Sequence, residues 1–425
     1  MSRVLLAAAL LAFLCQCCDG TRKTFSLGGI GGDLVQTGGT GGVAGGTSAT
    51  DPNTLDVTVD PGPQDIGYTN GLFATVTLCV PGTTTCQTFD HLLVDTGSVG
   101  VRVLESELKL ALPVVANTDG QPLAECTPFV DGTAWGPLRM ADVVLGGESA
   151  ANLPLQLIGE KTYAMPASCT GSAITDFKTL AANGILGVGV YLQDCGAACA
   201  QPATGRTTNP GLYYACASAQ SCTTTWVPLE QQVAHPVAAF PEDNNGTIIQ
   251  LPSIAASGAP SVPGVLTFGI GTRTNNGLGS ATVLALDSRT GYVSTTFPVG
   301  GTTYTSYLDS GSNGLFFLDA ATTKLKACTG GLSSFYCPTS TTNLSATLSS
   351  VNGASAAINF SVINASKLSN SAYAFSNLAG PMPGFPNDTS VPGFDWGLPF
   401  FFGRTVYTAI EAQSTPAGVG PYFAF

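Results

Sequence analysis

The chain has 425 residues, which is longer than one compact domain usually runs, so two domains are expected. Its 52 glycines and 27 prolines, with only 10% charged residues, favour short strands and many turns over long surface helices, and predict an all-β fold. The net charge of −12 excludes the basic surface that nucleic-acid binding needs and disfavours binding to an anionic membrane surface.

The N-terminus has the pattern of an export signal, which we assign to residues 1–18. Arg3 precedes an apolar run over residues 4–14 that is too short to span a bilayer. We therefore expect an exported protein that is periplasmic, extracellular or held at the outer surface. Cys17 lies where a bacterial lipoprotein carries its lipid, but Gln16 before it is not small, so a lipid anchor and ordinary cleavage both stay open.

Residues 19–53 form a Gly-rich segment that we interpret as a flexible linker, because it has too few apolar side chains to build a core. Of the thirteen cysteines, three lie in the signal region and ten remain, an even number that indicates disulfides in an exported chain. We expect Cys79 to pair with Cys86, Cys126 with Cys169, and Cys328 with Cys337. The other two bridges join Cys195, Cys199, Cys216 and Cys222 in an order that the sequence leaves open.

Two segments repeat one pattern: an apolar strand, an Asp, a small hydroxyl residue, a Gly and a Ser, then a second apolar strand. The first contains Asp95, Thr96, Gly97 and Ser98; the second contains Asp309, Ser310, Gly311 and Ser312. A lone Asp-Thr-Gly is a common turn. Two such turns in matching contexts are instead typical of a carboxylate pair that shares one proton, with one member activating a water molecule and the other donating to a peptide carbonyl.

Competing chemistries have less support in the sequence. With only two histidines, His91 and His235, we expect no metal site and no cofactor. A Ser-His-Asp hydrolase would need a Ser in a strand-to-helix elbow, and no segment has that pattern. The Gly-rich segment is not followed by a helix with Lys and Ser or Thr, which argues against nucleotide binding.

The two motifs resemble the active-site loops of pepsin-like aspartic peptidases, and residues 183–189 (NGILGVG) and 395–411 (DWGLPFFFGRTVYTAIE) resemble the strands that complete those loops. The chain is also similar to a family of exported bacterial proteins of unassigned function that share these DTG and DSG motifs. The resemblance implies an all-β, bilobal pepsin-like fold with pseudo-two-fold lobes around a cleft. We place the first lobe at residues 54–280, with a Cys-rich insertion at about 193–258, and the second at 281–425.

The resemblance implies catalytic roles for Asp95 and Asp309, with Thr96 and Ser310 linking the loops and Ser98 and Ser312 bonding the outer carboxylate oxygens. The chain departs from the family pattern at two positions of the flap, the β-hairpin that closes over the substrate. Phe129 stands where the flap of the family has a Tyr, and Arg102 stands where the family has the Trp that holds the Tyr hydroxyl. Trp135 either replaces that aromatic wall of the cleft or packs on its own hairpin.

The predicted function is that of an aspartic endopeptidase acting on polypeptides, expected as a monomer because both lobes lie in one chain. The alternative is an exported binding or surface protein that has kept the pepsin-like scaffold without turnover. Intact motifs in both lobes favour catalysis.

Overall fold

The structure is a computed structural model that describes residues 51–129, 132–200, 209–298, 301–387 and 392–425. The predicted signal peptide, its cysteines and most of the predicted linker lie outside these residues. Three α-helices occur among the described residues, α1 (Phe177–Leu180), α2 (Ala197–Ala200) and α3 (Ala320–Thr323), and each has four residues. None of the described helices has the length and apolarity needed to cross a membrane.

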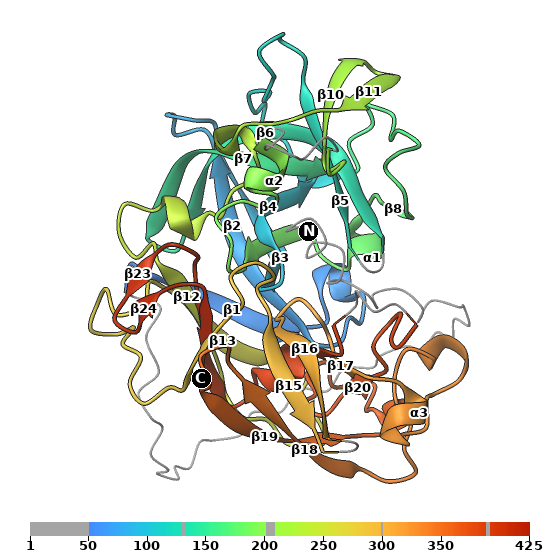
Figure 1. The fold of residues 1–425 in the computed structure, drawn as a ribbon. Helices are drawn as coiled ribbons and strands as arrows, with labels where there is room; N and C mark the ends of the chain where they lie inside the picture. The colour runs from blue at the N-terminus through green and yellow to red at the C-terminus, as the bar shows by residue number, and fades with distance from the viewer. Residues whose placement is uncertain (1–50, 130–131, 201–208, 299–300, 388–391) are drawn as a thin grey trace, which may run out of the picture.

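The predicted all-β, bilobal architecture is confirmed: one lobe lies above the other in Figure 1. A sixteen-stranded sheet begins in the first lobe and continues into the second, and a separate seven-stranded sheet, in the order β19-β18-β15-β16-β21-β17-β20, builds the rest of the second lobe. The strands of that second sheet are β15 (Val293–Phe297), β16 (Thr302–Leu308), β17 (Leu315–Phe317), β18 (Thr342–Ser349), β19 (Ser355–Val362), β20 (Ala379–Gly380) and β21 (Phe394–Trp396).

The first lobe is built from hairpins and crossing strands of the larger sheet. Its order from the outer edge is β11-β10-β5-β6-β7-β4-β9-β3-β2, with β8 beside β6. The bounds are β2 (Gly71–Cys79), β3 (Cys86–Asp95), β4 (Val99–Leu104), β5 (Leu123–Pro128), β6 (Thr133–Leu145), β7 (Glu148–Ile158), β8 (Ala173–Ile174), β9 (Gly184–Val188), β10 (Tyr213–Ser218) and β11 (Ser221–Thr224).

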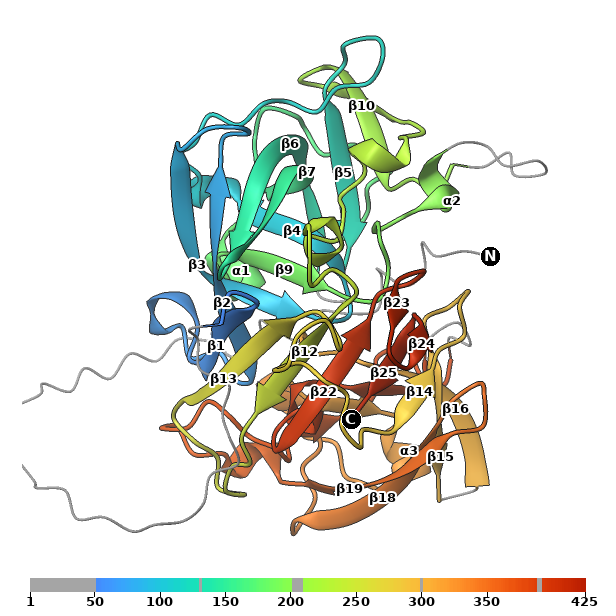
Figure 2. The same ribbon diagram turned by 90° about the vertical axis from the view of Figure 1, so that its left-hand side faces the viewer.

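Six strands from the N-terminal, middle and C-terminal parts of the chain run side by side, as Figure 2 shows. Their order is β1-β13-β12-β22-β25-β14, and β12 bonds to β13 on one side and β22 on the other. The bounds are β1 (Thr54–Asp60), β12 (Gly246–Leu251), β13 (Val262–Phe268), β14 (Val283–Ala285), β22 (Arg404–Ala409) and β25 (Tyr422–Ala424); β23 (Ser414–Thr415) and β24 (Gly418–Val419) form a small hairpin nearby.

One boundary from the sequence is corrected here. Residues 246–251, which we placed in the Cys-rich insertion, form β12 and are a central strand of the shared sheet. Ile248, Ile249 and Leu251 are buried there, so both faces of this strand contact protein. Asn244 and Asn245 lie just before the strand and mark the turn into it, and Gly246 is its first residue.

Buried and half-buried residues alternate along β15 of the second-lobe sheet, as expected for a strand with one face toward the core. In β15, Val293, Thr295 and Phe297 are buried and the residues between them are half-buried. The Trp396 indole donates to Thr295 Oγ1 at 3.0 Å and stacks on Phe394, with ring centroids 5.5 Å apart. These contacts fix β21 beneath the candidate site.

Candidate active site

The first aspartate loop is supported by a crossing of three strands. Asp95 is the last residue of β3, which pairs in parallel with β9, and β4 after the loop pairs antiparallel with the same β9. The loop between β3 and β4 therefore lies at the end of β9. Gly189, the residue after β9, donates its N–H to the Ser98 carbonyl in this loop at 2.8 Å. Asp95 has no exposed surface.

The second lobe repeats this arrangement. β16 leads to Asp309 and pairs in parallel with β21, while β17 beyond the loop pairs antiparallel with β21. Asp309 and Ser310 are fully buried. Residues 183–189 and the start of residues 395–411 thus occupy the positions that the resemblance implies, each between the two strands of its aspartate loop.

Four hydrogen bonds join the two loops to each other. The Thr96 N–H donates to Ser310 Oγ at 3.1 Å, and the Ser310 N–H donates to Thr96 Oγ1 at 2.9 Å. Each hydroxyl then donates across the interface, Thr96 to the Leu308 carbonyl at 3.1 Å and Ser310 to the Val94 carbonyl at 2.7 Å. This reciprocal lock holds the ends of the two aspartate strands at a fixed separation.

Backbone and hydroxyl donors orient the carboxylates. The Gly97 N–H donates to Asp95 Oδ1 at 2.8 Å, and Ser98 Oγ donates to Asp95 Oδ2. The Gly311 N–H donates to Asp309 Oδ1 at 2.9 Å. A Cβ on Gly311 would lie 2.6 Å from Asp95 Oδ1 and 3.2 Å from Asp309 Oδ1, so only glycine fits between the two carboxylates.

The surroundings of Asp309 favour its protonated form. Burial, followed by the charge of Asp95 and then of Asp395, raises the pKa of Asp309 well above its ordinary value. Among the described residues, Asp309 Oδ2 is buried without a hydrogen-bond partner, whereas both oxygens of Asp95 accept hydrogen bonds. Asp309 is therefore the member of the pair whose surroundings favour the protonated form, while hydrogen-bond donors reach both oxygens of Asp95.

Two further polar residues at the site were not predicted from the sequence. Asp395 in β21 is 3% exposed, and burial, followed by the charge of Asp95, raises its pKa well above the ordinary value. Tyr307 in β16 lies opposite it in the ladder and is also buried. The available signal was a comparison of the repeats, because the Ile of GILG in the first lobe corresponds to the Asp of FDWG in the second.

The two aromatic residues of the predicted flap lie in different surroundings. Phe129 follows β5 and is buried in an apolar cluster with Leu93 and Ile158. Trp135 in β6 donates its indole N–H to the Tyr163 carbonyl at 2.9 Å and packs edge-on against Tyr214 at 5.2 Å. Trp135 thus lies in a buried cluster with Cys126, Cys169 and Tyr214.

Arg102 forms a buried ionic centre at the base of that hairpin. Its Nη2 lies 2.8 Å from Glu125 Oε1 in β5 and 2.9 Å from Asp194 Oδ2, and its Nε donates to Gln156 Oε1 at 3.1 Å. The side chains of the three charged groups are at most 4% exposed. Burial, and next the adjacent Glu125, raise the pKa of Asp194 well above its ordinary value. An ionic anchor thus lies where the pepsin-like flap would have an aromatic one.

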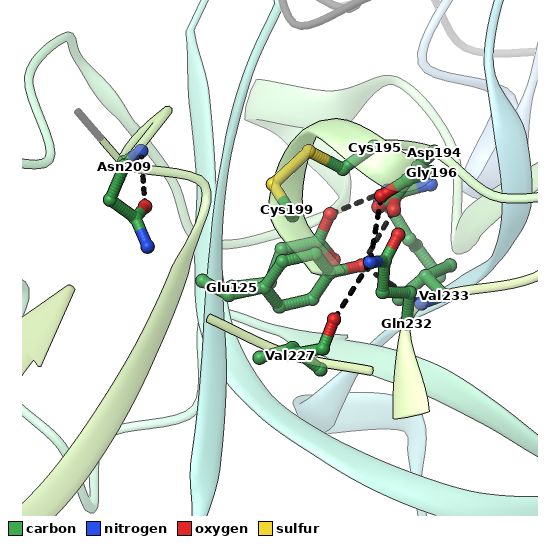
Figure 3. The surroundings of a disulfide bond; sticks show 12 residues. Glu125, Asp194, Cys195, Gly196, Cys199, Asn209, Val227, Gln232 and Val233 are labelled. Atoms are coloured by element: carbon green, nitrogen blue, oxygen red, sulfur yellow. Dashed lines mark hydrogen bonds and ion pairs between the residues drawn. A yellow bond between two sulfur atoms is a disulfide. The ribbon is translucent and has the colours of Figure 1, made fainter. Parts of the chain in front are cut away.

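A disulfide and a buried tyrosine complete this centre. Tyr213 donates its hydroxyl to Asp194 Oδ1 at 2.6 Å and accepts the Val233 N–H at 2.9 Å. Figure 3 shows the Cys195–Cys199 disulfide beside Asp194 and Gln232. The structure pairs the ten cysteines as Cys79–Cys86, Cys126–Cys169, Cys195–Cys199, Cys216–Cys222 and Cys328–Cys337. Five disulfides indicate an extracytoplasmic protein.

No group of three or more His, Cys, Asp or Glu side chains in the described part of the chain is arranged to hold a metal ion. His91 contacts Asp60 at 3.4 Å, while His235 is buried and accepts the Val237 N–H at Nδ1.

Comparison with known proteins agrees with this geometry. Among solved structures, the chain is similar to the aspartic proteinase from Irpex lacteus, with a TM-score of 0.50 and 14% sequence identity over 87% of this chain and 96% of that one. At this identity the likeness establishes the fold alone. No curated protein matches the sequence. Residues 49–425 match the family described as "Protein of unknown function (DUF3443)". The chain therefore belongs to the DUF3443 family, and it has the pepsin-like fold.

Proposed function

We propose that this chain is an aspartic endopeptidase that hydrolyses peptide bonds with a water molecule activated by Asp95 and Asp309. The observation that carries the proposal is the reciprocal lock between Thr96 and Ser310, which places two buried carboxylates on either side of Gly311. A scaffold used only for binding has no chemical need for two matched, interlocked loops of this kind.

The asymmetry of the pair assigns a role to each carboxylate. Asp95, with both oxygens hydrogen-bonded, is the base that takes a proton from water as the water oxygen attacks the carbonyl carbon. Asp309, which keeps its proton, is the acid that donates to the carbonyl oxygen. The resulting tetrahedral species then breaks its C–N bond as Asp95 gives the proton it took from water to the amide nitrogen, and Asp309 recovers a proton from the hydroxyl group that becomes the carbonyl of the new acid.

The substrate and location form part of the same proposal. The cleft takes a polypeptide in an extended conformation, and the protein acts as an exported monomer, periplasmic, extracellular or at the outer surface, with a lipid anchor at the N-terminus as the tethered form. The disulfides and the apolar N-terminal run support export. The acidic composition supports the absence of a nucleic-acid partner.

The flap gives the one observation that favours the alternative of a binding protein without turnover. Phe129 brings no hydroxyl to the hairpin, and Arg102 anchors the base of the hairpin through ions instead of an aromatic contact. A ligand-binding cleft would tolerate these changes.

The test is cleavage of a denatured protein substrate from about pH 3 to about pH 7 by the purified mature chain. Wild type is compared with Asp95→Asn, Asp309→Asn and an exposed control, Asp56→Asn in β1, each with and without pepstatin. We expect activity in wild type and the control, blocked by pepstatin, and its loss in both site variants. A correctly disulfide-bonded wild type that cleaves nothing across this range would refute the peptidase and leave the binding protein.

A further inference from the structure

The candidate site contains a third carboxyl group that the shared-proton mechanism does not use. Asp395 lies in β21, where it pairs with Tyr307 of β16 on one side and with Phe316 of β17 on the other. The charge of Asp395 contributes to the raised pKa of Asp309, after burial and the charge of Asp95. The charge of Asp95 in turn contributes to the raised pKa of Asp395, after burial. The hydroxyl of Ser312 interacts with both Asp309 and Asp395, and connects them.

The internal repeat shows that this polar pair is not required by the fold. The ladder position of Tyr307 and Asp395 corresponds in the first lobe to Leu93 of β3 and Ile185 of β9. Those two residues are buried and belong to one apolar cluster. The same crossing of strands is therefore built with an apolar pair in one lobe and with a phenol and a carboxyl group in the other.

Burying a carboxyl group there is costly unless it stays neutral or gains a partner. Among the described residues, no cation forms an ion pair with Asp95, Asp309 or Asp395. The titratable groups that face Asp395 are Tyr307 from β16, Asp309 from the following loop and Asp95 from the first lobe, while β17 brings only Leu and Phe side chains. Three like charges in contact cannot all form, so the cluster must retain protons.

Two buried carboxyl oxygens at this site have no hydrogen-bond partner within the described chain: Asp309 Oδ2 and Asp395 Oδ1. A buried oxygen without a donor is destabilising, whereas a protonated oxygen becomes a donor itself. Asp95 has no such free oxygen. The geometry therefore puts the protons of the cluster on the second lobe.

We propose that Asp395 is a positioning residue that shares protons with Asp309, so that the three carboxyl groups hold two protons in the working state and Asp309 keeps its acid proton to higher pH. The inference rests on the proposed function for its kinetic consequence, but the proton count does not depend on turnover. When Asp395 does ionise, its charge adds to that of Asp95 and holds the proton on Asp309 more strongly. The enzyme would then work at a higher pH than a site with two carboxylates.

The proton count is measured directly by infrared difference spectroscopy of the carboxyl C=O band during a pH titration. The proteins are wild type, Asp395→Asn, Asp309→Asn, and Asp56→Asn as the exposed control. We expect wild type to retain protonated carboxyl absorption at neutral pH, where exposed carboxyl groups have ionised. Asp395→Asn and Asp309→Asn should each lower this absorption, and the control should leave it unchanged.

The kinetic measurement is the pH profile of kcat/KM for the same proteins. As the pH rises, ionisation of Asp395 would add a charge that holds the proton on Asp309. Asp395→Asn cannot gain that charge, so we expect the basic limb of its profile to move to lower pH by about one unit. Asp395→Glu keeps a carboxyl group and should restore most of that limb. A purely structural role would lower kcat/KM without moving the limb.

The outcomes separate this inference from the proposed function. If wild type cleaves nothing, the function fails, and the infrared titration still decides the proton count. If Asp395→Asn leaves the neutral-pH absorption unchanged, the inference is wrong whatever the activity. If Asp395→Asn does not fold, Asp395→Ile, which copies Ile185 of the first lobe, serves in both measurements with the same expected loss.

Discussion

Replacement of Arg102 by Met tests whether a buried ionic centre holds the flap hairpin to the first lobe. The change keeps most of the side-chain volume but leaves Glu125 and Asp194 buried without a counter-ion. Removal of one partner from a buried ion pair costs about 3 to 5 kcal/mol. Arg102→Met should therefore lower the free energy of unfolding in urea by about that amount at neutral pH.

The pH dependence of this loss follows from the two carboxylates. Burial alone would raise the pKa of Glu125, but the attraction of Arg102 outweighs it, so the pKa is lowered. Glu125 then contributes stability that is present above the ordinary carboxyl pKa and is lost as the pH falls. Without Arg102 both carboxyl groups must be protonated on folding. That costs free energy at neutral pH and little in acid, so the loss should shrink toward about pH 4.

The control is Arg289→Met, which removes the same charge from a side chain that is 86% exposed and should change stability by less than about 1 kcal/mol. A loss for Arg102→Met below about 1 kcal/mol, or one of equal size at both pH values, would refute the ionic anchor.

Three other changes test the site and its scaffold. Gly311→Ala should reduce kcat/KM by at least about 100-fold with the fold retained, because the new methyl group displaces the Asp95 carboxylate. The control is Gly277→Ala, where a Cβ meets nothing within 4 Å, and it should leave kcat/KM unchanged. Thr96→Val removes one hydroxyl of the lock and should cost about 1 to 3 kcal/mol in urea unfolding; an unchanged midpoint would mean that the loops are held by other contacts. Replacing Cys126 and Cys169 by Ser opens a loop with a sequence separation of 43 and should lower the free energy of unfolding by about 4 kcal/mol. Removing the Cys79–Cys86 bridge, with a separation of 7, should lower it by about 2.5 kcal/mol. A larger loss for the shorter loop would contradict a stabilisation that comes from chain entropy.

Features that depend on short stretches of sequence could be predicted. Each aspartate loop is a strand, a turn and a strand, and its residues are adjacent in the chain, so the motif alone located Asp95 and Asp309. The hairpin bridges Cys79–Cys86 and Cys328–Cys337 were accessible for the same reason, since each closes over fewer than about ten residues.

Features that depend on register or on distant contacts could not be predicted. Whether Trp135 faces the cleft or packs on its own hairpin depends on which face of β6 it occupies, and a register shift of one residue moves it to the other face. Arg102 is recognisable as the centre of an ionic network only once Asp194, 92 positions away, is placed beside it. Asp395 begins the segment that resembles the strands completing the second loop, and the apolar and aromatic residues around it give no sign that its carboxyl group lies at the site.

The reciprocal lock also determines when the proposed active site is first complete during folding. Thr96 and Ser310 are 214 positions apart, so their hydrogen bonds form only after both lobes have folded and docked. An intermediate with one folded lobe contains one carboxylate and no partner for it, and contacts between such distant segments form late and slowly. On the proposed function, the chain cannot cleave a peptide bond while only one lobe is folded, because the second carboxyl group is still missing. The two loops then complete the site as the last step of folding.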